Sequence, residues 1–165
     1  MLEPQINSGK RVGNSDKRMP SLKALVIGYG SIGQRHARVL MELGCRVAVM
    51  SRRSIAFEPS YSELSEALSA WQPRYVVIAN RTSEHFQTVE ALAQYGFRDC
   101  VLIEKPLFGQ TVEMPKQSFS HIAVGYNLRC HPLLRRLKSF LEDAGSILTA
   151  HVYVGSYLPH WRPNT

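Results

Sequence analysis

Residues 24–33 constrain the fold of this chain more than any other segment, because an apolar run leads there directly into a glycine-rich turn. The run Ala-Leu-Val-Ile is typical of a buried strand, and Gly28, Gly30 and Gly33 follow it in the spacing G-x-G-x-x-G. Gly28 permits a tight turn, Gly30 allows a pyrophosphate to approach the backbone, and Gly33 lets the next helix lie close to the strand. A strand, a glycine turn and a helix in this order predict a nucleotide site.

The helix that begins after this turn contributes the second half of the predicted site. Its first backbone N–H groups have no partner inside the helix, and the helix dipole is positive at the same end. We therefore predict that Ser31 and Ile32 bind phosphate groups together with the glycines. The alternative is a tight strand–helix turn that binds no ligand.

Strands and helices alternate from residue 22 onwards. Apolar runs predict strands at 22–28, 46–51, 75–79, 100–104 and 121–126. Amphipathic segments predict helices that begin near residues 31, 60, 83 and 132. Apolar strands separated by helices indicate a parallel sheet that is covered on both faces. The sequence therefore predicts an α/β fold of the Rossmann type, with a doubly wound parallel sheet.

The periodicity of these helices predicts which side chains they bury. The helix at 31–43 is expected to bury Ile32, His36, Val39, Leu40 and Leu43. Residues 60–63, Ser-Tyr-Ser-Glu, are typical of a capping box, and the helix that they open is expected to turn Leu64, Leu68 and Trp71 inward. The last helix is expected to bury Leu133, Leu134, Leu137, Phe140 and Leu141.

Composition and patterning divide the chain into three parts. Residues 1–20 are rich in Gly, Ser, Asn, Lys and Arg and are expected to form a disordered tail. Residues 21–145 are expected to form the dinucleotide-binding domain. Alternation of apolar and polar residues at 146–157 predicts a half-buried strand, at the start of a truncated second domain at 146–165. That strand is expected to pair with a second copy, giving a homo-oligomer, or to be disordered.

The composition disfavours several other classes of protein. The formal net charge is +7, but the Lys and Arg residues are scattered without interleaved aromatic residues, so nucleic acid is not the expected partner. No apolar run approaches the roughly 20 residues that cross a bilayer, so no membrane partner is expected either. Cys45, Cys100 and Cys130 are odd in number and widely spaced, which indicates free thiols and a cytoplasmic location. No cluster of His, Cys and Asp has the spacing of a metal site.

The residues after the second strand indicate which nucleotide binds. Enzymes that use NAD place an acidic residue there against the ribose hydroxyls, whereas this chain has Ser51, Arg52 and Arg53. Arginine can bind phosphate through two parallel hydrogen bonds, so the segment favours the 2′-phosphate of NADP, with NAD as the alternative cofactor. A solvated basic loop is the alternative without a ligand. A methyltransferase would also need an acidic residue here and is disfavoured.

Further motifs follow one another in order along the chain. They are G-x-G-x-x-G-x-x-H at 28–36, Ala-Asn-Arg-Thr-Ser-Glu-His at 79–85, Glu-Lys-Pro at 104–106, Gly-Tyr-Asn-Leu-Arg at 125–129, Gly-Ser-Tyr-Leu-Pro at 155–159 and Trp-Arg-Pro at 161–163. As an ordered set over roughly residues 21–165, they resemble the glucose–fructose oxidoreductase and inositol dehydrogenase family, Gfo/Idh/MocA.

The resemblance implies a two-domain enzyme that oxidises or reduces a carbohydrate or cyclitol carbon with NAD or NADP. It implies that Lys105 lies near the nicotinamide and the substrate, where a lysine can take the alcohol proton or hold the oxygen. It also predicts a cis peptide bond between Lys105 and Pro106. The family's Asp/His catalytic pair lies downstream of this chain, which is therefore expected to bind the cofactor without turnover. A non-catalytic dinucleotide-binding module is the alternative.

Other site residues follow from their places in the same motifs. The residues expected near the cofactor are Asn80, Arg81, Thr82, His85, Glu104 and Lys105. Those expected near a small carbohydrate-like substrate are Tyr126, Asn127 and Arg129. Local capping is the alternative role for Asn80 and Thr82, and packing is the alternative role for His85. His36 is expected to pack rather than to bind a ligand.

Overall fold

The structure, a computed structural model, describes residues 21–116 and 119–155. The chain divides into two compact units, one up to Gly125 and one from Tyr126 onwards. The predicted tail at 1–20 and the motif residues after 155 lie outside the described residues. The candidate site belongs to the first unit, and the second unit is described separately below.

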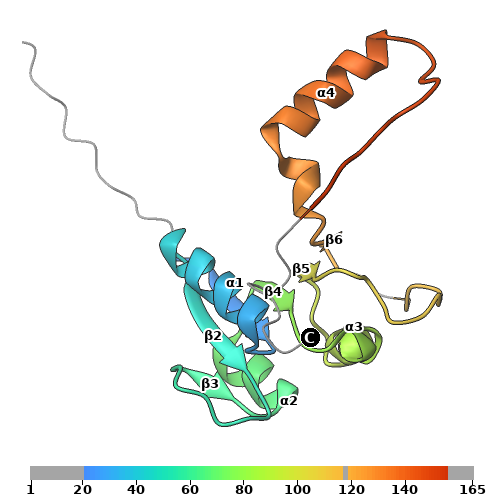
Figure 1. Cartoon of the computed structure of the whole chain (residues 1–165). Helices are drawn as coiled ribbons and strands as arrows, with labels where there is room; N and C mark the ends of the chain where they lie inside the picture. Colours follow the sequence, from blue (N-terminus) through green and yellow to red (C-terminus); the bar gives the residue numbers. More distant parts are fainter. Residues whose placement is uncertain (1–20, 117–118, 156–165) are drawn as a thin grey trace, which may run out of the picture. The chain divides into compact units, whose positions relative to one another are not determined.

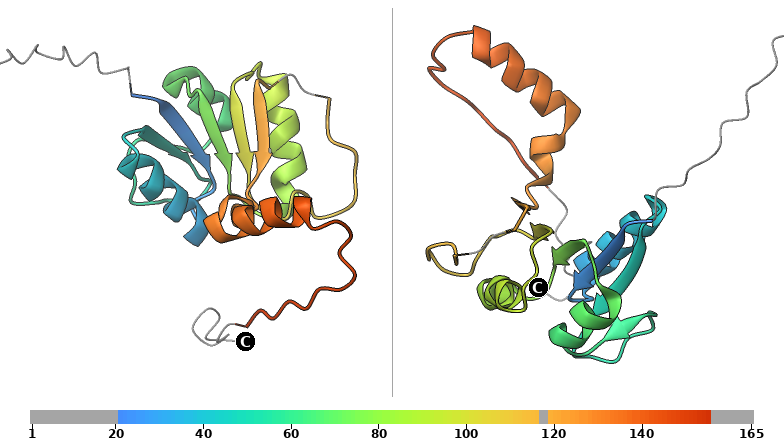
Figure 2. Two further views of the ribbon diagram at one scale, coloured as in Figure 1. Left: turned by 90° about the horizontal axis from the view of Figure 1, so that it is seen from above. Right: turned by 180° about the vertical axis from the view of Figure 1, so that it is seen from behind.

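A six-stranded parallel sheet forms the centre of the first unit, in the order β3-β2-β1-β4-β5-β6 (Figure 1). The left view of Figure 2 shows its strands side by side. They are β1 (Lys23–Ile27), β2 (Arg46–Met50), β3 (Ser60–Tyr61), β4 (Tyr75–Ile78), β5 (Cys100–Ile103) and β6 (His121–Val124). The chain builds the sheet outward from β1 in one direction and then, from β4, in the other. This is the order of a Rossmann-type sheet, and it confirms the predicted fold class.

Helices cover both faces of this sheet. One face carries α1 (Ser31–Glu42). The other carries α2 (Leu64–Glu66), its continuation η1 (Ala67–Trp71), and α3 (His85–Gln94), which follows the short helix η2 (Thr82–Glu84). Because the central strands are buried on both sides, their sequences are apolar without interruption.

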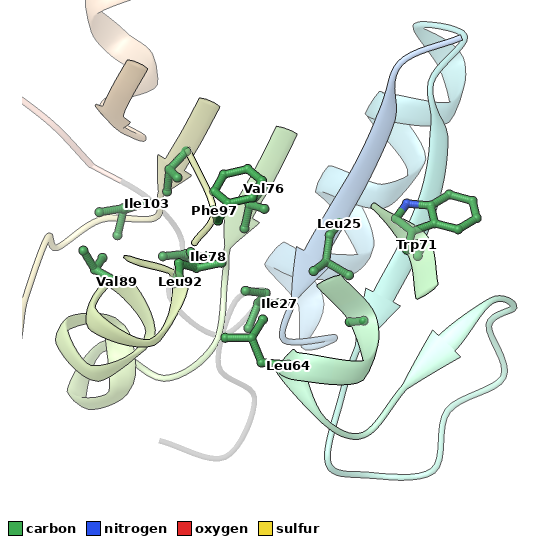
Figure 3. Packing of buried hydrophobic residues seen from close by; sticks show 13 residues of the cluster. Leu25, Ile27, Leu64, Trp71, Val76, Ile78, Val89, Leu92, Phe97 and Ile103 are labelled. Atoms are coloured by element: carbon green, nitrogen blue, oxygen red, sulfur yellow. The ribbon is translucent and has the colours of Figure 1, made fainter. Parts of the chain in front are cut away.

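The larger part of the core lies between the sheet and α2, η1 and α3 (Figure 3). Alternate strand residues such as Leu25, Ile27 and Ile78 meet Leu64 and Leu92 there. The indole N–H of Trp71 donates a hydrogen bond of 2.9 Å to the carbonyl of Ala24. This bond ties η1 to β1, the strand that leads into the glycine turn.

The buried face of α1 differs from the prediction. The residues that it buries are Gly33, Ala37 and Leu40. Of the predicted face, Leu40 is buried and His36 half-buried, whereas Ile32, Val39 and Leu43 are 44%, 40% and 74% exposed. The helix lies too close to the glycine turn for large side chains, since a Cβ on Gly33 would overlap the carbonyl oxygen of Gly28.

Residues 60–63 do not form the predicted capping box. Ser60 and Tyr61 instead form β3, which pairs in parallel with the last residues of β2. The helix begins later, at Leu64, and its N-cap Glu63 makes no side-chain capping bond. The open edge of β2 supplies backbone partners that compete with helix formation here. The predicted burial of Leu64 and Trp71 is confirmed, and Leu68 is half-buried.

The second unit contains η3 (Asn127–Cys130) and α4 (Pro132–Asp143). As predicted, α4 begins at a proline and ends before Gly145, whose φ is +75°. The predicted burial of its apolar face is wrong: Leu133, Leu134, Leu137 and Phe140 are 70%, 43%, 49% and 70% exposed, and Leu141 is half-buried. Periodicity shows that a helix has an apolar face, but burial also needs a partner surface, which the described residues of this unit lack.

Residues 146–155 do not form the predicted strand. Leu148, Val152 and Val154 are 95%, 81% and 92% exposed. A strand is stable only when a neighbouring strand takes its backbone hydrogen bonds, and none does so among the described residues. Pairing of this segment with a second copy stays a prediction.

Candidate nucleotide-binding cleft

A cleft of about 910 Å³ lies at the carboxyl edge of the sheet. Its lining includes Gly28, Tyr29 and Gly30 after β1, Ser51, Arg52 and Arg53 after β2, and Asn80, Arg81, Ser83 and Glu84 after β4. Much of the remaining wall is formed by Glu63 and Leu64, by Gln87, Thr88 and Ala91 of α3, and by Tyr95 directly after α3. The sheet changes its winding direction between β1 and β4, and such a switch point is where open α/β sheets bind ligands.

The glycine turn at the cleft has the geometry that each glycine was predicted to provide. Gly28 has a φ of +95°, and a Cβ there would lie 2.6 Å from the backbone of Asn80. A Cβ on Gly30 would meet no described atom within 4 Å. Gly28 is therefore required by the fold, whereas the small size of Gly30 leaves open space beside the backbone at the entrance of α1.

The N-terminus of α1 opens beside this space. Gly30 is its N-cap, and the carbonyl of Gly30 accepts the amide of Gln34 at 2.9 Å. The first turn of the helix carries no acidic side chain. The unpaired N–H groups of a first turn and the positive end of the helix dipole favour an anion at this point. The first turn of α1 contains Ser31, Ile32 and Gly33, and these three residues are not part of the cleft lining.

Asn80 carries a buried acceptor without a partner. Its Nδ2 donates to Oγ1 of Thr88 at 2.9 Å and to Oε2 of Glu84 at 3.3 Å, while Thr88 Oγ1 donates to the Glu84 carbonyl at 2.8 Å. Among the described residues, Oδ1 of Asn80 is a buried side-chain atom that accepts no hydrogen bond. Native structures rarely leave such an atom unpaired, and a ligand hydroxyl in the cleft would supply the missing hydrogen bond to Oδ1. The ribose of a nucleotide carries such hydroxyl groups, and the site therefore fits the group that the sequence predicts.

The segment after β2 is a compact turn with two arginines at its tip. Oγ of Ser51 lies 3.0 Å from the carbonyl of Arg53 and 3.2 Å from its amide. Nη2 of Arg52 forms an ion pair of 2.6 Å with Oε1 of Glu84, which belongs to the opposite wall of the cleft. The guanidinium of Arg53 makes no ion pair or hydrogen bond with the described residues. Arg53 also lines a second hollow of about 610 Å³ together with Gly30 and Gln34.

His85 is buried beneath the cleft rather than exposed in it. It is 1% exposed and does not line the cleft. Its Nδ1 lies 3.2 Å and 3.0 Å from the carbonyls of Pro106 and Leu107, and its Nε2 lies 3.3 Å from the carbonyl of Asn80. The histidine therefore joins the turn after β4 to the loop after β5, which is the packing role considered for it in the sequence.

Glu104 and Lys105 follow β5, and the peptide bond between Lys105 and Pro106 is cis as predicted. Oε1 of Glu104 lies 2.7 Å from Nε2 of His36, and its Oε2 accepts the Lys105 amide at 3.2 Å. A Cβ on Gly125 would come within 3.0 Å of the same carboxylate. The Glu104 carboxylate is thus held between α1, β5 and β6, while the Lys105 side chain is exposed.

The structure brings part of the predicted site together in one cleft. The predicted residues that line it are Gly28, Gly30, Ser51, Arg52, Arg53, Asn80 and Arg81. Thr82, Glu104 and Lys105 do not line it, and Tyr126, Asn127 and Arg129 belong to the second unit. Glu84 and Thr88 were not predicted from the sequence as site residues. They are four positions apart in the helix predicted to begin near residue 83, and this spacing places both side chains on one face of a helix.

Within the described ranges, no group of three or more His, Cys, Asp or Glu residues could hold a metal ion. Among the helices that the structure describes, none is long and apolar enough to cross a membrane.

The sheet order, the glycine turn and the cleft at the switch point define a Rossmann-type nucleotide-binding domain. More particularly, the chain belongs to the Gfo/Idh/MocA oxidoreductase family, whose sequence model, described as an NAD-binding Rossmann fold, matches residues 22–124. A search of curated proteins found no match to the chain.

Several solved structures share the fold. Myo-inositol 2-dehydrogenase from Lactobacillus plantarum is 23% identical, with a TM-score of 0.63 over 78% of this chain and 43% of its own. A probable dehydrogenase from Thermotoga maritima is 25% identical, with a TM-score of 0.62 over 74% of this chain and 41% of its own. The WlbA dehydrogenase from Bordetella pertussis, solved with NADH and UDP-GlcNAcA, is 18% identical, with a TM-score of 0.63 over 76% and 43%. This chain thus spans less than half the length of these relatives.

Proposed function

We propose that this chain is the cofactor-binding domain of an oxidoreductase that moves a hydride between a nicotinamide and a CH–OH carbon of a sugar-like or cyclitol-like substrate. The observation that carries the proposal is the open space beside Gly30, at the first turn of α1 and inside the cleft. A pyrophosphate placed there would meet backbone N–H groups and the positive end of the helix dipole. Family membership supports the same chemistry, because the family is described as NAD-binding oxidoreductases.

NADP is the cofactor that we propose, with NAD as the alternative. Arg52 and Arg53 line the cleft just after β2, where a 2′-phosphate would lie in a Rossmann-type domain. No acidic side chain follows β2 directly to accept two ribose hydroxyls, because Ser51 fills that position. Two relatives were solved with a nicotinamide nucleotide of this kind, WlbA with NADH and GenD2 from gentamicin A biosynthesis with NAD. The preference for NADP therefore rests on the arginines alone.

When bound, the nicotinamide would supply the hydride chemistry. The residues of this chain would bind and orient it: the glycine turn would hold the pyrophosphate and Asn80 Oδ1 would accept a ribose hydroxyl. We propose that Lys105 holds the proton at the alcohol oxygen, and that Tyr126, Asn127 and Arg129 bind the substrate. Glu104 and His85 would position the loop that carries Lys105, since their hydrogen bonds reach its backbone. A cytoplasmic location remains part of the proposal.

Isothermal titration calorimetry of the whole chain with NADP and with NAD tests the proposal. We expect one binding site, with NADP bound more tightly than NAD. Arg53→Gln should weaken NADP and leave NAD nearly unchanged, because Arg53 would contact only the 2′-phosphate. If neither nucleotide binds at millimolar concentration, the proposed function is wrong.

A further inference from the structure

We propose that Glu84 is a specificity residue that lowers the preference for NADP over NAD, because it competes with the 2′-phosphate for Arg52. This inference rests on the proposed function and adds a residue on the wall of the cleft opposite the arginines. It starts from the ion pair of 2.6 Å between Nη2 of Arg52 and Oε1 of Glu84. Both residues line the cleft, so the pair lies at the surface that a ligand in the cleft would meet.

Glu84 is the better-held partner of this pair. Its side chain is 31% exposed, and its Oε2 accepts a hydrogen bond of 3.3 Å from Asn80. Its backbone carbonyl accepts the Thr88 hydroxyl at 2.8 Å. The Arg52 side chain is 69% exposed, and its guanidinium has no further partner among the described residues. A ligand that needs Arg52 must therefore draw the arginine away from a carboxylate that stays in place.

The two cofactors differ in charge at the 2′ position of the ribose, the group that Arg52 would bind. NADP carries a phosphate where NAD carries a ribose hydroxyl, and a phosphate monoester has a charge of about −1.5 to −2 at pH 7. The cleft is lined by the cations Arg52, Arg53 and Arg81 and by the anions Glu63 and Glu84. Glu84 would repel the phosphate and also occupy Arg52, whereas neither effect acts on a neutral hydroxyl. Its charge therefore affects NADP far more than NAD.

Glu84→Gln is the direct test, because glutamine keeps the size of the side chain and can still accept from Asn80. By calorimetry at about 0.15 M salt, we expect its affinity for NADP to rise about threefold to fivefold, and its affinity for NAD to change by less than about twofold. Glu90→Gln is the matched control, since it also removes one negative charge but at a residue of α3 that does not line the cleft. It should leave the ratio of the two affinities unchanged.

The double variant Arg52→Gln/Glu84→Gln tests the competition itself. If Glu84 acts through Arg52, the Glu84→Gln substitution should raise NADP affinity less when Arg52 is absent than when it is present. Equal effects in the two backgrounds would overturn the competition. Thermal unfolding of each variant by circular dichroism would show that the fold is retained.

The outcomes separate this inference from the proposed function. If the unmodified chain binds NADP or NAD but Glu84→Gln leaves the affinity ratio unchanged, only the role of Glu84 is wrong. The same conclusion follows if Glu84→Gln weakens both nucleotides equally, because Glu84 would then support the cleft without selecting the cofactor. If the unmodified chain binds neither nucleotide, the proposed function fails and the specificity role fails with it.

Discussion

Nε2 of His36 lies 2.7 Å from Oε1 of Glu104, although the two residues are 68 positions apart in the sequence. The pair joins the middle of α1 to the carboxyl end of β5, and both side chains are mostly buried, with 24% and 18% exposed. A carboxylate only accepts hydrogen bonds, so the histidine is the donor. The same carboxylate accepts the Lys105 amide, which makes this contact the link between α1 and the loop of the proposed catalytic lysine.

We expect His36→Ala to lower the free energy of unfolding by about 1–3 kcal/mol, because it leaves Oε1 of a mostly buried carboxylate without its donor. Urea unfolding measures the change. Arg38→Ala is the matched control on the same helix, since it removes an ion pair of 3.8 Å with Glu42 whose side chains are 68% and 67% exposed. That variant should change the free energy by less than about 0.5 kcal/mol. Equal effects of the two substitutions would contradict a structural role for the His36–Glu104 pair.

Two alanine substitutions in the glycine turn should separate folding from binding. Gly33→Ala should destabilise the domain by about 3 kcal/mol or more, because the new Cβ would overlap the carbonyl oxygen of Gly28. Gly30→Ala should cost less than about 1 kcal/mol, since its Cβ would meet no described atom within 4 Å. It should nevertheless weaken nucleotide binding at least tenfold, about 1.4 kcal/mol, by filling the space proposed for the pyrophosphate. Urea unfolding and calorimetry together test both expectations, and a Gly30→Ala variant with unchanged affinity would contradict the second.

Asn80→Ala should weaken NAD and NADP by a similar factor, about fivefold to thirtyfold, because Oδ1 would accept a ribose hydroxyl present in both. The measurement is calorimetry with each nucleotide. Thr88→Val is the control, since it removes the hydroxyl that supports Asn80 and leaves the acceptor itself in place. If Asn80→Ala lowers only the stability and leaves both affinities unchanged, the unpaired oxygen has no ligand role.

The stability of the domain should fall at alkaline pH through Tyr75. Burial, with a smaller contribution from the thiols of Cys100 and Cys45, raises the pKa of its phenol above 10.0. The unfolded chain then loses this proton first, so the native state binds more protons as the pH rises through about 10, and the free energy of unfolding decreases there. In Tyr75→Phe the decrease should be smaller. Urea unfolding between about pH 8 and pH 11 checks this, and identical curves for the two proteins would contradict it.

The sequence predicts the fold well where local pattern and long-range packing agree. The central strands β1, β2 and β4 are buried on both faces, so their sequences are continuous apolar runs that can be recognised as strands. The glycine spacing predicts the turn because neighbouring backbone atoms leave no room for a Cβ at Gly28 or at Gly33. The family resemblance, stated from motif order, is confirmed by the match at residues 22–124.

The features that the sequence does not predict depend on what lies opposite a residue. β3 forms because Ser60 and Tyr61 can pair with the edge of β2. The identity of these two residues does not show that such an edge lies beside them. The apolar stripe of α4 predicts a helix but not the surface that would cover it. The pairing of Arg52 with Glu84 joins segments 32 residues apart, so only the sheet order brings them to one cleft.

Amide chemical-shift mapping by NMR, with the nucleotide titrated into the whole isotope-labelled chain, tests whether the glycine turn binds the cofactor. We expect the largest shifts on Gly28 and Gly30, on the first turn of α1 and on Asn80, with further shifts at Arg52 and Arg53 only for NADP. Saturable shifts confined to other parts of the chain, or no shifts at millimolar nucleotide, would contradict this expectation.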